Sequence, residues 1–226
     1  MDTQTTSPRQ FKDAMYRQLA RIGKAVASGP RLELLDLLSQ SPRTVDALAK
    51  QISQSVANTS HHLQTLRRAR LVESQRDGVR VIYRVADNDV AAFFTAMRRL
   101  GESRLLEMNQ VNDDFFSQRA PVEPIDRAVL MDRVKAGTVS VIDVRPRQEY
   151  DVGHLPGALS LPLAELEERI AELPNDRQVV AYCRGPYCLM ALEAAQLLVD
   201  HGYDAVRFEE GVSDWRSDGL PVEVGA

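Results

Sequence analysis

Apolar residues recur every three or four positions along the first part of the chain, the spacing that gives a helix one buried face. This pattern predicts helices over residues 11–27, 31–38, 45–52 and 56–69. Ser55 stands where it would cap the last of these helices. Two strand-like runs then follow, residues 71–76 and 79–85, and they flank Asp77-Gly78. Asp-Gly between two such runs is typical of a β-hairpin.

A longer helix is predicted over residues 90–118. Its seam positions step by three and four residues, close to a heptad repeat, and all are apolar except Arg104: Val90, Phe93, Met97, Leu100, Arg104, Met108, Val111 and Phe115. A seam of this length favours a partner helix and therefore a dimer interface. Packing of the helix on its own domain is the alternative.

The pattern changes after residue 124, where short apolar strands alternate with amphipathic helices. Strands are predicted over residues 139–144, 178–182 and 205–208, and helices over 163–172 and 189–201. This alternation indicates a parallel sheet covered by helices. The predicted organisation is a disordered lead (1–9), a mainly α domain (10–118), a linker (119–124) and an α/β domain (125–226).

Composition and charge narrow the class of protein. The first 120 of the 226 residues carry 18 basic and 13 acidic side chains, whereas the remainder carries 10 and 19. This asymmetry makes the first domain the candidate for binding nucleic acid. The sequence shows no apolar run long enough to span a membrane and no secretory signal. Its two cysteines exclude a disulfide scaffold and a four-cysteine zinc site. We expect a cytoplasmic protein with no membrane partner.

A helix, a tight turn, a second helix and a hairpin form the layout of a winged helix-turn-helix. Residues 55–84 contain six arginines and only two acidic residues, Glu73 and Asp77, so positive charge is concentrated in this segment. The start of the second helix is placed to meet phosphates and base edges, and the hairpin to meet the backbone or a minor groove. The predicted DNA contacts are Ser55, Asn58, Thr59, Ser60, His61, Arg67, Arg76 and Arg80.

Residues of about 10–118 resemble the arsenic-repressor (ArsR) family. The matching stretch is Ser55-x4-Ser60-His61-His62-Leu63-x2-Leu66-x2-Ala69-x-Leu71-Val72, followed by the Asp77-Gly78 wing. The resemblance implies a homodimer, formed through the N-terminal helix and the 90–118 helix, that binds palindromic operator DNA. The family often senses metals through cysteines in the helix before the recognition helix, or through Asp and His in the last helix. Residues 45–52 lack Cys and residues 90–118 lack His, so we predict no metal site and no other cofactor.

Both cysteines lie in one short segment, Cys183-Arg184-Gly185-Pro186-Tyr187-Cys188, between a predicted strand and a predicted helix. A thiol at the carboxyl edge of a parallel sheet faces the backbone N–H groups and positive end of the next helix. Both features lower a thiol pKa and favour the nucleophilic thiolate. Cys183 is therefore the predicted nucleophile, with Arg184, Gly185, Pro186 and Tyr187 forming the substrate loop. An inert buried cysteine is the alternative.

Two further motifs resemble the signatures of the rhodanese domain. The first is Val141-Ile142-Asp143-Val144-Arg145-x3-Glu149-Tyr150-x2-Gly153-His154-Leu155-x-Gly157-Ala158, and the second is Glu210-Gly211-x3-Trp215 followed by Gly219-Leu220-Pro221-Val222. The resemblance implies that Cys183 accepts a sulfane sulfur as a persulfide, cradled by loop amides. We expect Asp143, Arg145, Glu149, His154 and Trp215 to hold the fold instead of taking part in the chemistry.

The loop departs from related patterns at its end. Phosphatases of this fold use Cys-x5-Arg, but Leu189 stands six residues after Cys183, which argues against phosphate chemistry. Cys188 occupies a position that is usually polar or basic in rhodanese domains. A thiol there is placed to attack the Cys183 persulfide, releasing sulfide and forming a bridge. Loop geometry that forbids the bridge, or a Cys188 that only packs under the loop, remains the alternative.

The combination predicts a transcriptional repressor that responds to reactive sulfur through Cys183, with Cys188 as the resolving thiol. A sulfane-sulfur donor and double-stranded operator DNA are its expected partners. A second hypothesis is an active sulfurtransferase, using thiosulfate or a persulfide, whose DNA-binding half regulates its own expression. A third is a repressor responsive to arsenite or another soft metal, although two thiolates without a third make a poor arsenite site.

Overall fold

The computed structural model describes residues 7–117 and 122–225, and these fall into two compact units divided after Phe94. The dividing point lies inside helix α5 (Asn88–Arg104), so the residues of that helix belong to both units along the chain. The two units are described separately below. None of the helices described is long and apolar enough to cross a membrane.

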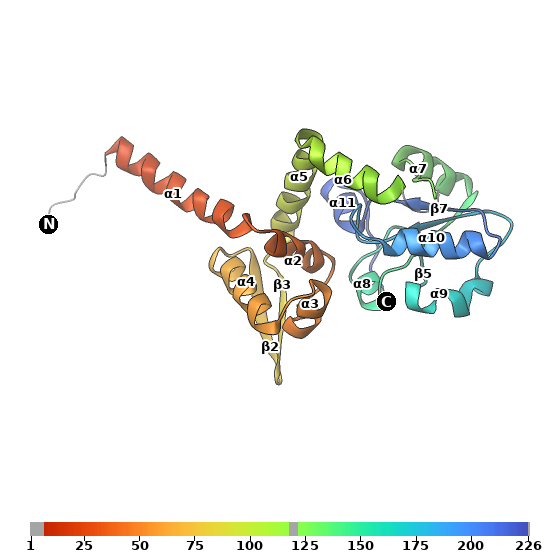
Figure 1. Ribbon diagram of the computed structural model, residues 1–226, viewed down its shortest axis with the longest axis horizontal. Coiled ribbons are helices and arrows are strands. Elements are labelled where there is room, and N and C mark those ends of the chain that lie inside the picture. Colours follow the sequence, from red (N-terminus) through yellow and green to blue (C-terminus); the bar gives the residue numbers. More distant parts are fainter. Residues whose placement is uncertain (1–6, 118–121, 226) are drawn as a thin grey trace. The chain divides into compact units, whose positions relative to one another are not determined.

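The first unit has two helices, then the short first strand of a three-stranded antiparallel sheet, then two more helices, and finally the hairpin that completes the sheet (Figure 1). The elements before α5 are α1 (Pro8–Val26), α2 (Gly29–Gln40), β1 (Arg43–Thr44), α3 (Val45–Gln51), α4 (Val56–Arg68), β2 (Val72–Asp77) and β3 (Arg80–Val85). The predicted helices and the hairpin are confirmed within a few residues at each end. Strand β1 is not predicted by the sequence pattern; it pairs with β3.

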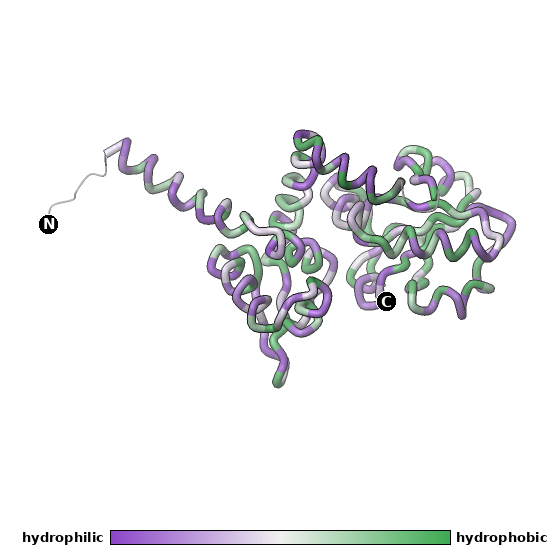
Figure 2. Tube along the Cα trace, viewed as in Figure 1, coloured by the Kyte–Doolittle hydropathy of each residue, from purple (hydrophilic) through white to green (hydrophobic). Residues whose placement is uncertain are grey.

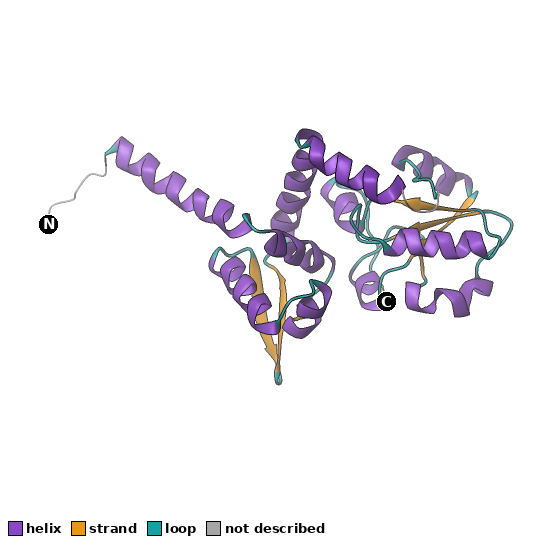
Figure 3. Cartoon of the chain, viewed as in Figure 1, coloured by secondary structure: helices purple, strands orange, loops and turns teal. Residues whose placement is uncertain are grey.

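Local sequence explains where these elements begin. The Ser55 side chain accepts a hydrogen bond from the backbone N–H of Asn58, which caps α4 as predicted. Thr44 caps α3 in the same way through the N–H of Ala47. Strands β2 and β3 pair from Val72 opposite Val85 to the tight turn, and the hairpin projects beyond the helices of its unit (Figure 3). The core beneath consists of fully buried leucines from α2, α3 and α4: Leu34, Leu35, Leu48, Leu63 and Leu66.

The predicted long helix over residues 90–118 is wrong as a single element. The structure has α5, ending at Arg104, and a separate α6 (Leu106–Ser117). Gly101 and Ser103 precede the break; glycine is a weak helix former, and the Ser103 hydroxyl donates to the carbonyl oxygen of Leu100. Arg104, the one charged residue in the predicted seam, is the last residue of α5, so the break falls where the apolar seam is interrupted.

The second unit, which also holds α6, is a parallel sheet covered by helices. Its remaining elements are α7 (Arg127–Ala136), β4 (Val139–Asp143), α8 (Arg147–Val152), β5 (Leu159–Ser160), α9 (Leu163–Arg169), a 3-10 turn (Ile170–Glu172), β6 (Gln178–Tyr182), α10 (Met190–Asp200), β7 (Ala205–Phe208) and α11 (Val212–Ser217). The predicted parallel sheet is confirmed, with strand order β5-β4-β6-β7. The sequence pattern does not predict the short elements α7, α8, β5 and α11.

Apolar side chains fill both faces of this sheet. Figure 2 shows its strands drawn mostly in the hydrophobic colour, as expected for a parallel sheet buried on both sides. One cluster includes Ile142, Val179 and Ala195 and reaches Cys183. The cluster on the other face includes Val180 and Trp215, whose ring meets Phe208 edge to face. The reactive loop therefore leaves the sheet from a well-packed core.

A buried charged network joins the carboxyl ends of β4 and β6. Arg145 and Asp143 are both completely buried, and their side chains form an ion pair at 2.6 Å. The Tyr182 hydroxyl donates to Asp143 at 2.6 Å and accepts the backbone N–H of Leu155. Arg145 also donates to the carbonyl oxygen of Gly153. These contacts confirm that Asp143 and Arg145 hold the fold.

The domain boundaries stay a prediction. The unit that begins at Thr95 takes in residues 95–118, which the sequence pattern assigns to the first domain. Residues 1–6 of the predicted lead and 118–121, which overlap the predicted linker, lie outside the described residues. Ser7, Pro8 and Arg9 of the predicted lead are described: Ser7 caps α1, and Pro8 and Arg9 already belong to that helix.

Replacing Asp143 by Ala should lower the free energy of unfolding of the second unit by about 3–5 kcal/mol, because Arg145 would stay buried without its partner. Urea unfolding followed by the fluorescence of Trp215, the one tryptophan of the sequence, measures this change. Asp151→Ala is the matched control, since Asp151 pairs with Arg147 at the surface and should contribute less than about 1 kcal/mol. Equal losses in the two variants would contradict the assignment.

Candidate functional site

The first unit presents an exposed polar surface on α4 and the β2–β3 hairpin. Asn58, His61 and Arg67 are exposed on α4, and Arg76 and Arg80 are exposed on the hairpin. Their side chains are therefore accessible to a ligand, as DNA contacts require. Ser55 is exposed and Ser60 partly buried, but the Ser55 hydroxyl is already engaged as the cap of α4.

Thr59 does not belong to this surface. Its side chain is completely buried, and its hydroxyl donates to the backbone carbonyl oxygen of Ser55. The prediction of Thr59 as a DNA contact is therefore wrong, because its position in the helix turns it towards the core. His62 is partly buried, and burial together with the charges of Arg31 and His61 lowers its pKa. Of the two adjacent histidines, His61 is therefore exposed and His62 is partly buried.

The two cysteines lie in the loop that joins β6 to α10. Cys183 follows the last residue of β6 and is 1% exposed, while Cys188 is partly buried. The Cys183 thiol donates a hydrogen bond to the backbone carbonyl oxygen of Cys188 at 3.3 Å. The two residues form no disulfide and stand as free thiols. The loop therefore brings the two cysteines into direct contact with each other.

The surroundings of the two thiols shift their pKa values in opposite directions, and the lowering falls on Cys188 where the sequence predicts it for Cys183. The hydrogen bond with Cys183, backbone N–H groups of Arg184 and Met190, and the Arg184 charge lower the pKa of Cys188 to about 6, against the opposing effect of burial. Burial raises the pKa of Cys183 well above its usual range, and the hydrogen bond and charge of Cys188 add to that rise. The expected lowering of the Cys183 pKa is wrong because that thiol lies too deep in the core.

Two glycines allow the loop its path. Gly185 has φ of 144°, a conformation that other residues rarely adopt. Gly211 precedes α11, and a Cβ atom there would overlap the backbone carbonyl of Arg184. The reactive loop and the turn before α11 therefore lie in direct contact. The backbone N–H of Gly211 donates to the carboxylate of Asp214 at 3.0 Å, which fixes the turn.

The Arg184 side chain, predicted to belong to the substrate loop, is bound to a carboxylate of the protein. Its guanidinium donates two hydrogen bonds to the carboxylate of Glu149, at 2.7 and 2.9 Å, and Glu149 is 1% exposed. This pair ties the loop to α8 and shows that Glu149 holds the fold, as predicted. Another loop side chain, Tyr187, is half exposed, and its hydroxyl donates to the Glu102 carboxylate of α5 at 2.9 Å.

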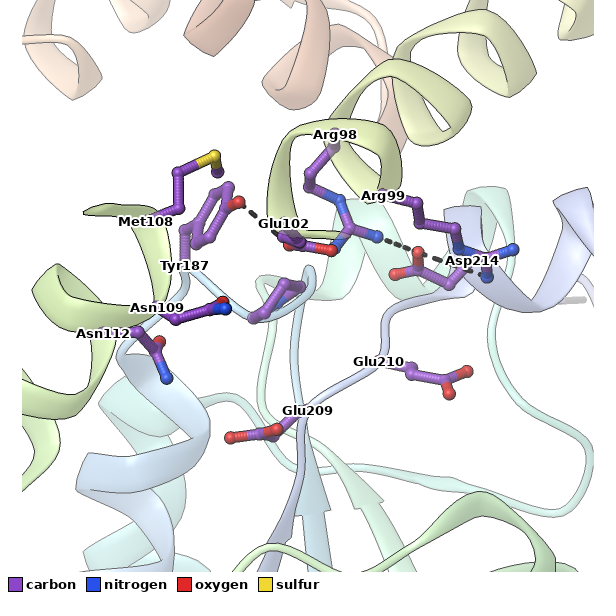
Figure 4. Close-up of a pocket in the computed structure, with 11 residues that line it drawn as sticks. Arg98, Arg99, Glu102, Met108, Asn109, Asn112, Tyr187, Glu209, Glu210 and Asp214 are labelled. Atoms are coloured by element: carbon purple, nitrogen blue, oxygen red, sulfur yellow. Dashed lines mark hydrogen bonds and ion pairs between the residues drawn. The ribbon is translucent and has the colours of Figure 1, made fainter. Parts of the chain in front are cut away.

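A polar cavity of about 310 Å³ lies where the end of α5, α6, the loop and the β7–α11 turn meet. Figure 4 shows Arg98 of α5 directed at Asp214, which is almost completely buried, and Tyr187 directed at Glu102. Arg98 also pairs with Glu102 at 2.8 Å. The next residue of α5, Arg99, pairs with Asp218 at 2.6 Å. Sequence reasoning missed the pairs of Arg98 with Asp214 and of Arg99 with Asp218 because residues more than a hundred positions apart leave no spacing pattern.

Comparison with protein families identifies both parts of the chain. Residues 29–74 match the family described as bacterial regulatory protein, arsR family, and residues 126–218 match the rhodanese-like domain. The HTH-type transcriptional regulator Rv0324 of Mycobacterium tuberculosis is 43% identical over 95% of this chain and 94% of its own length. A sulfurtransferase of Allochromatium vinosum is 34% identical over 45% of this chain and 94% of its own length.

Two solved structures resemble separate parts of the chain. The homodimeric winged helix-turn-helix DNA-binding domain of Mb0332 from Mycobacterium bovis is 41% identical, with a TM-score of 0.41, and covers 46% of this chain and 94% of that one. A rhodanese-related protein from Thermoplasma volcanium is 26% identical, with a TM-score of 0.41, and covers 46% of this chain and 99% of that one.

Limiting iodoacetamide at pH 7 should alkylate Cys188 before Cys183, because the pKa of Cys188 is about 6 and that of buried Cys183 is raised. The rate at Cys188 should fall as the pH drops through about 6, since the thiolate is then protonated. Trypsin cuts after Arg184 and separates the two cysteines for mass spectrometry. The chain unfolded in urea is the control and should label both equally; earlier labelling of Cys183 in the folded chain would contradict the pKa order.

Proposed function

Since this chain belongs to the family of HTH-type transcriptional regulators, with an arsR-type domain followed by a rhodanese-like domain, we propose that it binds operator DNA with an affinity set by sulfur chemistry at Cys183 and Cys188. The observation that carries this proposal is the hydrogen-bonded contact between the two cysteines in the loop after β6. A reactive thiol pair attached to a regulator gives the regulator a chemical input.

The DNA-binding half acts as a homodimer on a palindromic operator. The exposed side chains of α4 enter the major groove, while Arg76 and Arg80 of the hairpin meet the DNA backbone. Helix α1 supports the dimer because it carries exposed apolar side chains at helical spacing, Phe11, Met15 and Leu19, each more than half exposed. Such a stripe is covered in a partner contact. Of the predicted 90–118 helix, α5 completes the interface, since Phe93 and Leu100 expose apolar side chains there.

The sulfur chemistry runs in two displacement steps. The Cys188 thiolate attacks the sulfane sulfur of a donor, forming a Cys188–persulfide, and the donor leaves with the electron pair of the broken bond. Cys183 then loses its proton and attacks the Sγ of Cys188. Sulfide leaves, the two cysteines are oxidised to a disulfide, and the transferred sulfur is reduced. The loop N–H groups of Arg184 and Met190 stabilise the anionic sulfur of Cys188 before the first step, and those of Gly185 and Ala191 stabilise that of Cys183 before the second.

The contacts of Tyr187 supply a route by which the loop affects the regulator. Formation of the disulfide moves the backbone on either side of Cys188. It therefore moves Tyr187, whose hydroxyl is hydrogen-bonded to Glu102. Arg98 links Glu102 to Asp214, next to the turn on which the loop packs. Glu102 and Arg98 both belong to α5, the helix that also contributes Val90 and Phe94 to the buried residues of the first unit.

An active sulfurtransferase is the second candidate function. The similarity to the Allochromatium vinosum sulfurtransferase over 103 residues favours it. In that case the persulfide passes to an external thiol, and no internal attack forms a bridge between the two cysteines. Steady turnover of thiosulfate with cyanide, combined with an unchanged DNA affinity, would favour this function over the regulatory one.

Saturating inorganic polysulfide should change the affinity of the wild-type chain for its upstream promoter DNA by about five- to 150-fold, the usual range of allosteric coupling. Cys183→Ser and Cys188→Ser should each remove this response, because neither variant forms the bridge. Fluorescence anisotropy with labelled promoter DNA measures both. Untreated variants are the control and should bind DNA as the untreated wild type does. A full response in Cys183→Ser would overturn the proposal.

Arg80→Ala should weaken DNA binding of all sequences alike and reduce the slope of log affinity against log salt by about one, because one phosphate contact is lost. Anisotropy titrations at several salt concentrations measure the slope. Arg177→Ala is the control: Arg177 is likewise an exposed arginine, but it lies in the second unit and pairs with Asp176. An unchanged slope for Arg80→Ala would exclude the hairpin from the DNA contact.

A further inference from the structure

An apolar cavity of about 510 Å³ lies between α6 and the thiol loop. This volume falls in the range of pockets that hold small organic molecules. Most of its wall is formed by apolar side chains of α6 and of the loop: Met108, Val111, Phe115, Pro186 and Leu189. The three α6 residues stand at helical spacing, which predicts a seam for a partner helix. In the structure the same side chains line a cavity within the second unit.

This cavity adjoins the reactive thiols. Pro186 and Leu189, which line it, stand on either side of Cys188 in the sequence. Phe116, another lining residue, packs with Cys188 against the core cluster that contains Cys183. A molecule in the cavity therefore contacts the loop residues that flank the partly buried cysteine, which reacts first in the proposed function.

The arginines around the loop are already engaged by carboxylates. Arg184 is held by Glu149 at 2.7 Å, and in the neighbouring polar cavity Arg98 is held by Glu102 and Asp214. Arg99 is the other arginine among the described residues that line the two cavities, and it pairs with Asp218. An anionic donor such as thiosulfate would have to leave water without gaining a cationic partner here, which is costly.

We propose that this cavity selects the sulfur donor, and that the donor is an uncharged organic polysulfide with apolar substituents, R–S–S–S–R. The inference rests on the proposed function, since it names the donor class of the same thiol pair. The substituent R lies against Val111 and Phe115, where burial of apolar surface stabilises binding. The sulfur chain then extends past Pro186 and Leu189 towards Cys188.

The reaction with this donor balances without a further oxidant. The Cys188 thiolate attacks an outer sulfur of the trisulfide, one S–S bond breaks, and R–S–S⁻ leaves. Cys183 loses its proton to solvent and attacks the Sγ of Cys188, which expels R–S⁻ and forms the Cys183–Cys188 disulfide. Two thiols are oxidised, and the trisulfide is reduced to a thiolate and a persulfide.

Binding is tested without chemistry by diallyl sulfide, which has the substituents of diallyl trisulfide but no S–S bond. The protein is the full chain carrying Cys183→Ser and Cys188→Ser, and calorimetric titration measures the affinity. Val111→Glu should weaken binding about tenfold or more, because it places a carboxylate on the apolar wall at an exposed helical position. Gln110→Glu adds the same charge one residue away, outside the cavity, and should leave the affinity unchanged.

Selectivity is tested on the chain with both cysteines present, by the rate at which the protein's own thiols are lost. Alkylated protein is measured by mass spectrometry, because the released R–S⁻ and R–S–S⁻ would also react with a thiol reagent in solution. Because the sequence has only two cysteines, this rate reports on the loop alone. Diallyl trisulfide should react about tenfold or more faster than charged glutathione trisulfide, relative to their rates with free cysteine, and Val111→Glu should abolish this preference. Equal relative rates, or the same loss in Gln110→Glu, would overturn the proposal.

Two further outcomes show whether the cavity holds a donor and whether the donor acts on DNA binding. If diallyl sulfide does not bind and Val111→Glu alters the oligomeric state, a second copy of the chain covers the cavity and the proposal is overturned. DNA affinity, measured in the same trisulfide-treated samples, tests the proposed function independently. Selective bridging with unchanged DNA affinity would sustain the donor class and refute the regulatory role.

Discussion

The carboxylate of Asp143 is the point on which the second unit depends. It neutralises the guanidinium of Arg145, which lies completely buried, and it accepts the hydroxyl of Tyr182. An uncompensated charge at this depth would be strongly destabilising, so the three side chains are tolerated only together. Because Asp143 ends β4 and Tyr182 ends β6, the network holds these two strand ends side by side.

Cys183 is the next residue after Tyr182, so the position of the reactive loop follows from this network. The first thiol is held at the edge of the core, where burial suppresses its ionisation. The second thiol stands nearer the surface and receives the hydrogen bond of the first together with loop amides, which lower its pKa. In the proposed function this arrangement gives two identical groups two roles: a thiolate that attacks first, and a protonated thiol that attacks second.

Sequence alone predicted the elements that local chemistry determines. Ser55 marked the start of α4, Asp77-Gly78 marked the hairpin, and the apolar strands of the sheet appeared as short β-rich runs. It also located the loop by its two cysteines. What escaped prediction depends on contacts distant in sequence or on depth. The inward turn of Thr59, the pairing of Arg98 with Asp214, and the exchange of pKa order between the cysteines have no signature in residue spacing.

The placement of the thiols bears on whether this chemistry serves a switch or an enzyme. A transferase must present its persulfide to an external acceptor after every transfer, and it gains from having no competing thiol nearby. Here Cys183 lies within a hydrogen bond of the Cys188 backbone and at 1% exposure. An internal attack is therefore favoured over an external one by proximity. In the proposed function each reaction then ends in a disulfide, which persists until a reductant opens it, and a state that persists is what a regulator of DNA binding requires.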